Sequence, residues 1–243
     1  MTQVTTNLRS AAVSALLLGL AASGMVSAEG PSGGAAAAPA PAMQALGRNR
    51  YRIGAILVDK KARRLTVSGR ILGGDRPLEY LAVARGGYKS YESLLELDTT
   101  GSEFNLACIL LGLDASLTKR PQYQFSKDGL TGQRVALEFS WKAGSRRVKA
   151  TGLQMLLTDA QRGVEKRDDW VYVGSYMQTD NTFGADMSGA LIGFVHDPNS
   201  VVEHALGLGI GAYGSVAGNK ALLPPNSTAI ELTMTILNGG VPQ

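Results

Sequence analysis

Regular alternation of apolar and polar residues over short runs is the feature that most constrains the fold of this chain. In RVALEFSWK, residues 134–142, apolar side chains occupy every second position from Val135 to Trp141. The run TAIELTMTIL, residues 228–237, repeats the pattern. Because successive side chains of a strand point to opposite faces, each run predicts a strand with one buried face.

Other apolar runs predict further strands, separated by charged or glycine-containing turns. These strands are expected at residues 51–59, 64–72, 78–84, 94–97, 146–150, 170–176 and 190–195. The turn from Lys60 to Arg63 joins the first two as a hairpin. The pattern predicts an α+β fold: a predominantly antiparallel β single domain with one or two short buried helices.

One helix is predicted at residues 103–111, where leucine and isoleucine recur at helical spacing. Ser102 suits the N-cap, and Glu103 suits the first helical turn. Residues 199–205 are expected to form one or two further helical turns. Residues 153–157 are equally compatible with a helix and a strand.

The N-terminus has the pattern of an export signal. Arg9 precedes an apolar run at residues 11–25, and Val26-Ser27-Ala28 places small residues at a cleavage site. We predict a signal peptide at residues 1–28, with an uncleaved membrane anchor as the alternative. Export to the periplasm or secretion follows, with no membrane span once the signal is removed.

An Ala, Gly and Pro-rich composition after the signal predicts a linker at residues 29–47, followed by a globular domain at residues 48–240. The 243 residues include one cysteine, Cys108, in an apolar context. A single cysteine excludes an internal disulfide and a thiolate metal cluster. We expect Cys108 to be buried and inert, and we predict no cofactor.

A net charge of +4 is too small to indicate a nucleic-acid partner. Basic residues gather at 60–64 and 146–149. We interpret them as solvated hairpin surfaces, and binding to a polyanion or an anionic envelope surface is the alternative.

The two histidines allow metal or acid–base chemistry in principle. His196 or His204 with Asp197 or Glu203 would supply zinc ligands. However, the sequence His-Asp-Pro-Asn from residue 196 is typical of a turn, which predicts an exposed His196.

Two further catalytic patterns lack their structural context. Ser175 or Ser188 with His196 and Asp186 would form a triad, but neither serine lies in Gly-x-Ser-x-Gly. The glycine pattern at residues 209–214 lacks the strand and helix of a dinucleotide site.

If the domain has a site, we expect it near Glu92 and Asp186, with Tyr91, Ser93 and Ser188 beside them. Each residue follows or precedes a glycine-containing turn next to a predicted strand, where a rigid scaffold presents polar groups. The alternative is structural: Glu92 and Ser93 cap backbone groups, and Asp186 and Ser188 shape a turn.

Several segments together resemble a known family. They are Glu92-Ser93 after the run LEYLAVARGG, the helix ending at Leu111-Gly112, WVYVGS at residues 170–175, and Asp-Met-Ser-Gly at residues 186–189. The combination, over residues 50–237, resembles the YdjY-like domain of exported bacterial proteins. The resemblance implies a fold and export, not an activity. The family often has His at the position of Tyr91, so a role for an imidazole at this position does not carry over to this chain. Some members carry iron–sulfur labels, which do not fit a chain with one cysteine.

We therefore expect an exported envelope protein with a non-catalytic domain that binds a small ligand or an envelope protein. The alternative is a hydrolase-like or metal-dependent periplasmic enzyme that uses the acidic and Ser residues. The two differ in whether Glu92, Ser175, Asp186 and His196 converge in one cleft.

Overall fold

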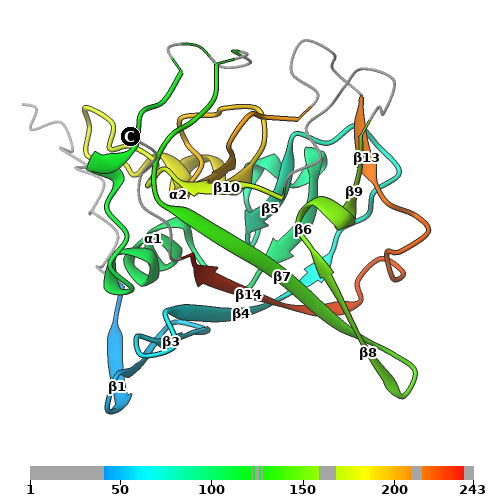
Figure 1. The fold of residues 1–243 in the computed structure, drawn as a ribbon, viewed down its shortest axis with the longest axis horizontal. Helices are drawn as coiled ribbons and strands as arrows, with labels where there is room; N and C mark the ends of the chain where they lie inside the picture. Colours follow the sequence, from blue (N-terminus) through cyan, green and yellow to red (C-terminus); the bar gives the residue numbers. More distant parts are fainter. Residues whose placement is uncertain are drawn as a thin grey trace, which may run out of the picture. The chain divides into compact units, whose positions relative to one another are not determined.

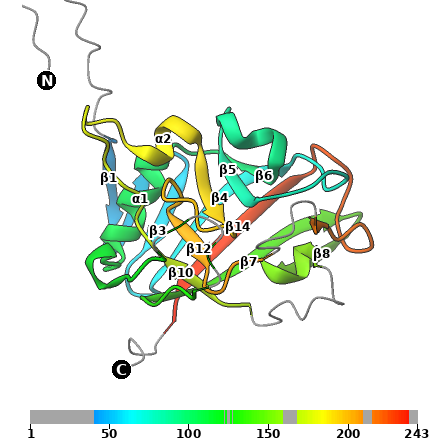
Figure 2. The ribbon, with the colours of Figure 1, turned by 90° about the horizontal axis from the view of Figure 1, so that it is seen from above.

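Eight strands close into a ring in the computed structural model, which describes residues 41–121, 123, 126, 128–158, 168–208 and 215–237. Figures 1 and 2 show the ring from two directions. Around the ring the strands are β4 (Arg64–Ile71), β14 (Ala229–Ile236), β7 (Arg134–Ala143), β10 (Trp170–Tyr172), β12 (Val202–His204), β11 (Ala190–Gly193), β5 (Tyr80–Ala84) and β6 (Ser93–Leu97). Pairing of β6 with β4 completes the closure, which removes both free sheet edges within the ring.

Four strands extend this ring sideways. On one side of β4 lie β3 (Ile56–Asp59), β2 (Arg50–Ile53) and β1 (Met43–Gly47), and β8 (Arg146–Thr151) pairs with β7. Strand β1 takes up residues that composition assigned to the end of the linker. Two short strands, β9 (Leu156–Thr158) and β13 (Val216–Gly218), form a separate pair.

The predicted strand at residues 51–59 is wrong in one respect, because it is itself the hairpin of β2 and β3. The turn between them contains Gly54 with φ of +54°. Glycine adopts this left-handed conformation without a steric penalty. The hairpin predicted across Lys60 to Arg63 is confirmed as the pair β3 and β4.

Most pairs of strands are antiparallel, as predicted, but β5 with β6 and β11 with β12 are parallel. Parallel neighbours need a crossover rather than a tight hairpin. The crossover from β5 to β6 contains the 3₁₀ helix η1 (Tyr88–Glu92). The other 3₁₀ turns are η2 (Ala115–Leu117) and η3 (Leu153–Met155). Residues 153–157 therefore hold both a helical turn and the start of a strand.

The predicted helix is confirmed as α1 (Gly101–Leu110). Its N-cap is Thr100 rather than Ser102: the Thr100 hydroxyl accepts from the Glu103 amide, and the Glu103 side chain accepts from the Thr100 amide. This reciprocal pair satisfies two of the amides that a helix end leaves unpaired. A second helix, α2 (Gly184–Ser188), was not predicted.

The expected helical turn at residues 199–205 is wrong, since residues 202–204 form β12 between β10 and β11. All three side chains of β12 are buried. Pairing on both sides outweighs local propensity for so short a segment.

The core fills the ring and the space beneath α1. Val135, Leu137, Phe139 and Trp141 are buried on one face of β7, as the alternation predicts. Cys108 is fully buried in α1, and burial raises the pKa of its thiol, as expected for an unreactive cysteine. The described chain is thus one compact, predominantly β unit with two short helices.

Candidate functional site

The turn η1 and the helix α2 lie against each other on one side of the ring, although almost a hundred residues separate them in sequence. In Figure 2, α2 and the helical turn between β5 and β6 lie side by side along the upper edge of the fold. Two glycines permit this approach. A Cβ at Gly189 would lie 2.4 Å from Gly87 Cα, and Gly189 also has φ of +80°. Any larger side chain at residue 189 would force the two segments apart.

Large side chains of these segments project into solvent. Tyr88 is 73% exposed, and its ring meets that of Tyr91 edge-to-face with centroids 5.9 Å apart. Met187 of α2 is 52% exposed, and Met177, whose backbone pairs with Phe183 just before α2, is also more than half exposed. We call Tyr88, Tyr91, Met177 and Met187 the η1–α2 patch.

A partly buried ion pair underlies the tyrosines. Lys89 Nζ lies 2.7 Å from Glu92 Oε1, and the Glu92 side chain is almost fully buried. The lysine also lies over the rings of Tyr80 and Tyr91, 5.6 and 5.7 Å from their centroids. Partial burial opposes the charge on Lys89, but the carboxylate of Glu92 prevails and raises its pKa.

Four of the five residues expected at a site lie on these contacting segments: Tyr91 and Glu92 belong to η1, and Asp186 and Ser188 belong to α2. The fifth, Ser93, directly follows η1 as the first residue of β6. Their hydrogen bonds are local or structural. The Ser93 hydroxyl donates to the Lys89 carbonyl at 2.7 Å. The Ser188 hydroxyl donates to the Gly184 carbonyl and accepts from the Ala190 amide.

Asp186 ties α2 to the start of α1. One carboxylate oxygen accepts from the Ser102 amide at 2.8 Å, and the other accepts from the Ser102 hydroxyl. A negative charge at a helix N-terminus is favourable, since amides there lack partners within the helix. This contact fixes the position of α2, and therefore that of the patch.

A second group of polar side chains, which sequence reasoning missed, is buried behind η1. The Tyr80 hydroxyl donates to Asp197 Oδ2 at 2.5 Å, and the Asn199 backbone and side-chain amides both donate to Asp197 Oδ1. His196 Nδ1 lies 3.1 Å from Glu203 Oε2, and both side chains are buried. Lys89, lying over the Tyr80 ring, connects this network to the η1–α2 patch.

The prediction of an exposed His196 is therefore wrong: the residue is 5% exposed. Its turn does form, with His196 at φ of +59°, but the turn folds back onto the sheet rather than into solvent. His204 lies on β12, where its ring packs edge-to-face on Trp170 with centroids 5.2 Å apart. No local pattern distinguishes a turn that packs inward from one that points outward.

Burial dominates the electrostatics of the network. It raises the pKa of Glu203 and of Tyr80, and it lowers the pKa of Arg120, whose Nη1 is 4.0 Å from Glu203 Oε1. Near the patch, burial followed by the charge of Glu92 raises the pKa of Glu79. Glu203 orients the His196 ring through Nδ1, and Nε2 is buried with no hydrogen-bond partner among the described residues.

The triad that combined Ser175 or Ser188 with His196 and Asp186 is not formed. Asp186 binds Ser102, Ser188 binds within its own helix turn, and the carboxylate beside His196 belongs to Glu203. Ser175 has φ of +56°, and its buried hydroxyl has no hydrogen-bond partner in the described part of the chain.

The described residues contain neither a metal-ligand cluster nor a helix that could span a membrane. There, no three His, Cys, Asp or Glu side chains are grouped to hold a metal ion. Within the same residues, no helix has the length and apolar character needed to cross a membrane. The predicted signal peptide and the glycine pattern at 209–214 lie outside the described residues.

Comparison with protein families matches the YdjY domain over residues 56–235. This range includes both η1 and α2, and it also contains the buried network. Comparisons with curated proteins and with solved structures found no match.

Proposed function

Because the chain belongs to the YdjY domain family, we propose that it is an exported, non-catalytic domain that binds a protein of the bacterial envelope through the η1–α2 patch. The observation that carries this proposal is the exposed group of two tyrosines and two methionines on contacting segments. Tyrosine and methionine are enriched where proteins bind one another. Methionine side chains also adapt to varied apolar partners.

The contacts beneath the η1–α2 patch hold it rigid, and a rigid surface favours binding. Close packing of Gly87 on Gly189 and the bonds of Asp186 to Ser102 hold both segments in place. A rigid surface loses less conformational entropy when a partner binds. Lys89 and Glu92 neutralise each other below the rings, so the centre of the patch carries little net charge.

The residues expected from sequence frame this surface. Tyr91 belongs to the patch itself, and Glu92, Ser93, Asp186 and Ser188 hold its two segments in shape. In this proposal their roles are to position the contact residues. A small ligand at the same place is the alternative occupant, and an experiment separates the two.

Photocrosslinking in the producing bacterium tests the proposal. A photoreactive phenylalanine analogue replaces Tyr88 in one variant and Tyr123 in another, because both tyrosines are 73% exposed. We expect a discrete protein adduct from position 88 that is absent from position 123. Met187→Asp should abolish the adduct, whereas Ile109→Asp, at a residue 53% exposed on α1, should leave it intact.

Equal crosslinking from both tyrosines would contradict the proposal, and so would an adduct unaffected by Met187→Asp. If position 88 yields no protein adduct while a small-molecule screen raises the melting temperature, and Tyr91→Ser removes that shift, the occupant is a ligand.

Export is tested separately by the intact mass of protein recovered from the envelope. The small residues at Val26-Ser27-Ala28 predict a chain that starts at Glu29. A mass that still includes Met1 would contradict removal of the leader.

A further inference from the structure

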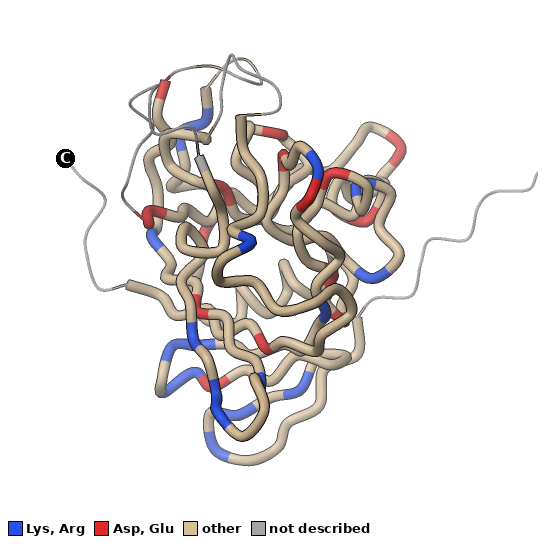
Figure 3. Tube along the Cα trace, turned by 90° about the vertical axis from the view of Figure 1, so that its right-hand side faces the viewer, with Lys and Arg blue, Asp and Glu red and all other residues tan. Residues whose placement is uncertain are grey.

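Positive charge is concentrated on one side of the described chain. We call the six neighbouring strands β2, β3, β4, β14, β7 and β8, with the turns that join them and residues 48–49 directly before β2, the outer sheet. Its segments, residues 48–71, 134–151 and 229–236, contain thirteen Lys or Arg and three Asp or Glu. The other described residues contain six basic and fourteen acidic residues. Figure 3 shows this separation, with most of the blue at the lower end of the tube and red prominent above.

The alternation of these strands explains why the charges share a face. Across the sheet, Arg52 is opposite Leu57, then Thr66, Thr233 and Glu138 follow in register. Residues in register point to the same side, and the opposite side fills the core. The basic residues of the outward side are Arg50, Arg52, Arg64, Arg70, Arg134, Lys142, Arg147 and Lys149, and those in or beside the turns are Arg48, Lys60, Lys61, Arg63 and Arg146. Of these, Arg134 pairs with Asp169 outside the outer sheet.

Acidic neighbours offset only a minority of this charge. Arg147 pairs with Glu231 and Lys149 with Glu138, each at 2.7 Å. Arg70 pairs with Glu96 from β6 at 2.8 Å. The pairs of Arg147 and Lys149 are about half exposed at both partners, so they are weak and readily exchanged for other anions. In the third pair the Glu96 carboxylate is buried.

Between the charges the outward side is mainly polar, with Leu57 half-buried among them. Thr66, Thr233 and Thr235 occupy its middle and are partly exposed. Among the described residues, none of the exposed large apolar side chains belongs to the outer sheet. A partner of this surface must therefore be held by charge rather than by apolar insertion.

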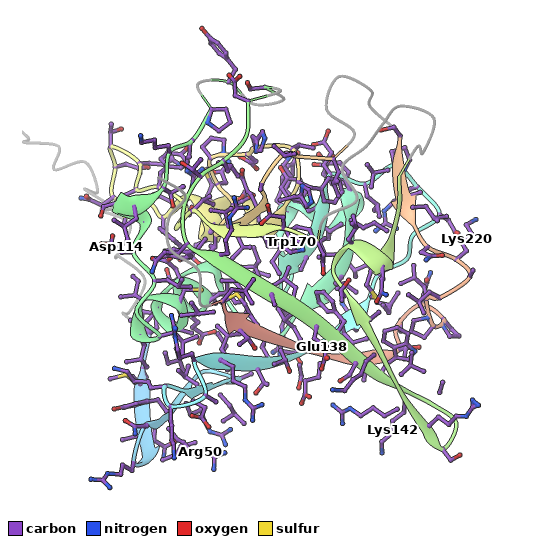
Figure 4. The ribbon with its side chains drawn as sticks, in the orientation of Figure 1. Arg50, Asp114, Glu138, Lys142, Trp170 and Lys220 are labelled. Atoms are coloured by element: carbon purple, nitrogen blue, oxygen red, sulfur yellow. The ribbon has the colours of Figure 1, made fainter. Side chains whose placement is uncertain are left out.

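From this arrangement we propose that the outer sheet binds the anionic phospholipid surface of a bilayer, as a peripheral contact. The charges are spread over two dimensions: Figure 4 places Arg50 at one end of the lower side and Lys142 at the other, with Glu138 between them. A planar array of headgroups contacts both ends at once, whereas a linear polyanion follows one row. Each basic residue near an anionic bilayer contributes on the order of 1 kcal/mol.

Such binding also orients the domain. In Figure 1, α2 lies on the upper side of the ribbon and β3, β4 and β14 lie on the lower side. The acidic excess of the remaining described residues is repelled by the same headgroups that attract the outer sheet. The η1–α2 patch would then face away from the bilayer, although the membrane contact does not depend on that patch having a partner.

Vesicle flotation of the protein purified from the envelope tests this inference. The probes are vesicles of phosphatidylcholine alone and vesicles that also contain phosphatidylglycerol. We expect binding only to the anionic vesicles, with loss at high salt because exposed charges are screened. Lys142→Glu with Arg146→Glu should weaken binding at least about 30-fold, since two favourable contacts are lost.

The matched control is Lys119→Glu with Lys220→Glu, which changes net charge equally at exposed residues outside the outer sheet. It should retain most of the binding, and melting temperatures confirm that both double variants fold. Equal weakening by the two pairs would overturn the inference, because net charge alone would then explain the binding. Absence of binding at low salt would also overturn it, as would binding to soluble polyphosphate without binding to vesicles.

Discussion

Two regions of the molecule differ in how many faces of their strands are buried. One is the outer sheet, and the other is the opposite wall of the ring, made of β10, β12, β11, β5 and β6. Strands β4 and β14 alternate strictly between buried and more exposed residues. In β5, β6 and β11 every residue is buried, because loops and helices cover the outer side of this wall. Water solvates the charges of the outer sheet, whereas the wall has to pair its charges within the protein.

The two regions therefore place charged groups under different physical constraints. On the outer sheet, Arg147 and Glu231 are both about half exposed. Behind the wall, His196 and Glu203 are almost fully buried and depend on each other. Exposed pairs contribute little to stability, whereas removing one partner of a buried pair leaves an uncompensated group. Binding to a charged surface suits the first arrangement, and holding a rigid patch suits the second.

The largest effect is expected where the outer sheet meets the core. Trp141→Ala should lower the free energy of unfolding by about 3 to 5 kcal/mol, because it removes a buried aromatic ring. The neighbouring variant Lys142→Ala, on the solvent side, should change stability by less than about 0.5 kcal/mol. Chemical denaturation measures both values. Similar losses of unfolding free energy from the two variants would mean that the outer sheet does not have one buried and one solvent-exposed face.

The next effect concerns how the wall brings η1 and α2 together. Gly189→Ala should cost more than about 2 kcal/mol, because a left-handed alanine alone costs about 1 to 2 kcal/mol and its Cβ would also collide with Gly87. Gly86→Ala is the control, with φ of +67° and open space around its Cβ position. Gly86→Ala should cost only the free energy of placing an alanine in the left-handed conformation, about 1 to 2 kcal/mol. Equal losses, measured by thermal unfolding, would show that close packing of the two segments is unimportant.

Glu203 should make the wall sensitive to pH. Burial raises its pKa above the ordinary 4.5, so the folded state binds this proton more tightly than the unfolded chain. Its contribution to stability is therefore greatest below pH 4.5 and declines as pH rises through the folded pKa. The free energy of unfolding of Glu203→Gln should decline less steeply than that of the wild type from pH 4.5 upward.

Urea unfolding over a pH series measures this difference in slope. The slopes are compared with those of Glu231→Gln on the outer sheet, which makes the same substitution at a residue about half exposed. Wild-type and Glu203→Gln curves that stay parallel would contradict a raised pKa for Glu203.

The smallest effect is expected from the exposed pair of the outer sheet. Glu231→Gln should reduce the free energy of unfolding by no more than about 1 kcal/mol, with a smaller loss at high salt. The same variant should strengthen flotation with anionic vesicles, since Arg147 gains access to headgroups. Weaker vesicle binding by this variant would show that Arg147 does not take part in the proposed membrane contact.

Sequence reasoning succeeded where a local pattern has a single physical meaning. Alternation correctly predicted β7, β14 and β4, because each has one face in water and one in the core. Helical spacing correctly predicted α1. The apolar context of Cys108 correctly predicted that this residue is buried. The N-cap was misplaced by two residues because Thr100 and Ser102 have the same capping chemistry, and only backbone geometry distinguishes them.

The candidate site was predictable in part. Glycine-containing turns pointed to Tyr91, Glu92, Asp186 and Ser188 as separate junctions, but their meeting depends on Gly87 and Gly189 approaching across the fold. The exposed methionines carry no sequence signal, because exposure of one side chain depends on what covers it.

What the sequence determined by itself was therefore the one-sided strands, the buried helix, the basic hairpins and the family. Each follows from residues that are close together in the chain. Tertiary structure alone decided the parallel pairs, the strand at residues 202–204 and the burial of His196 beside Glu203. A strand buried on both faces has no alternation to read, and a turn packs inward or outward according to distant neighbours. The division between the charged outer sheet and the covered wall arises at that level, when closure of the ring leaves one side to solvent and places loops and helices over the other.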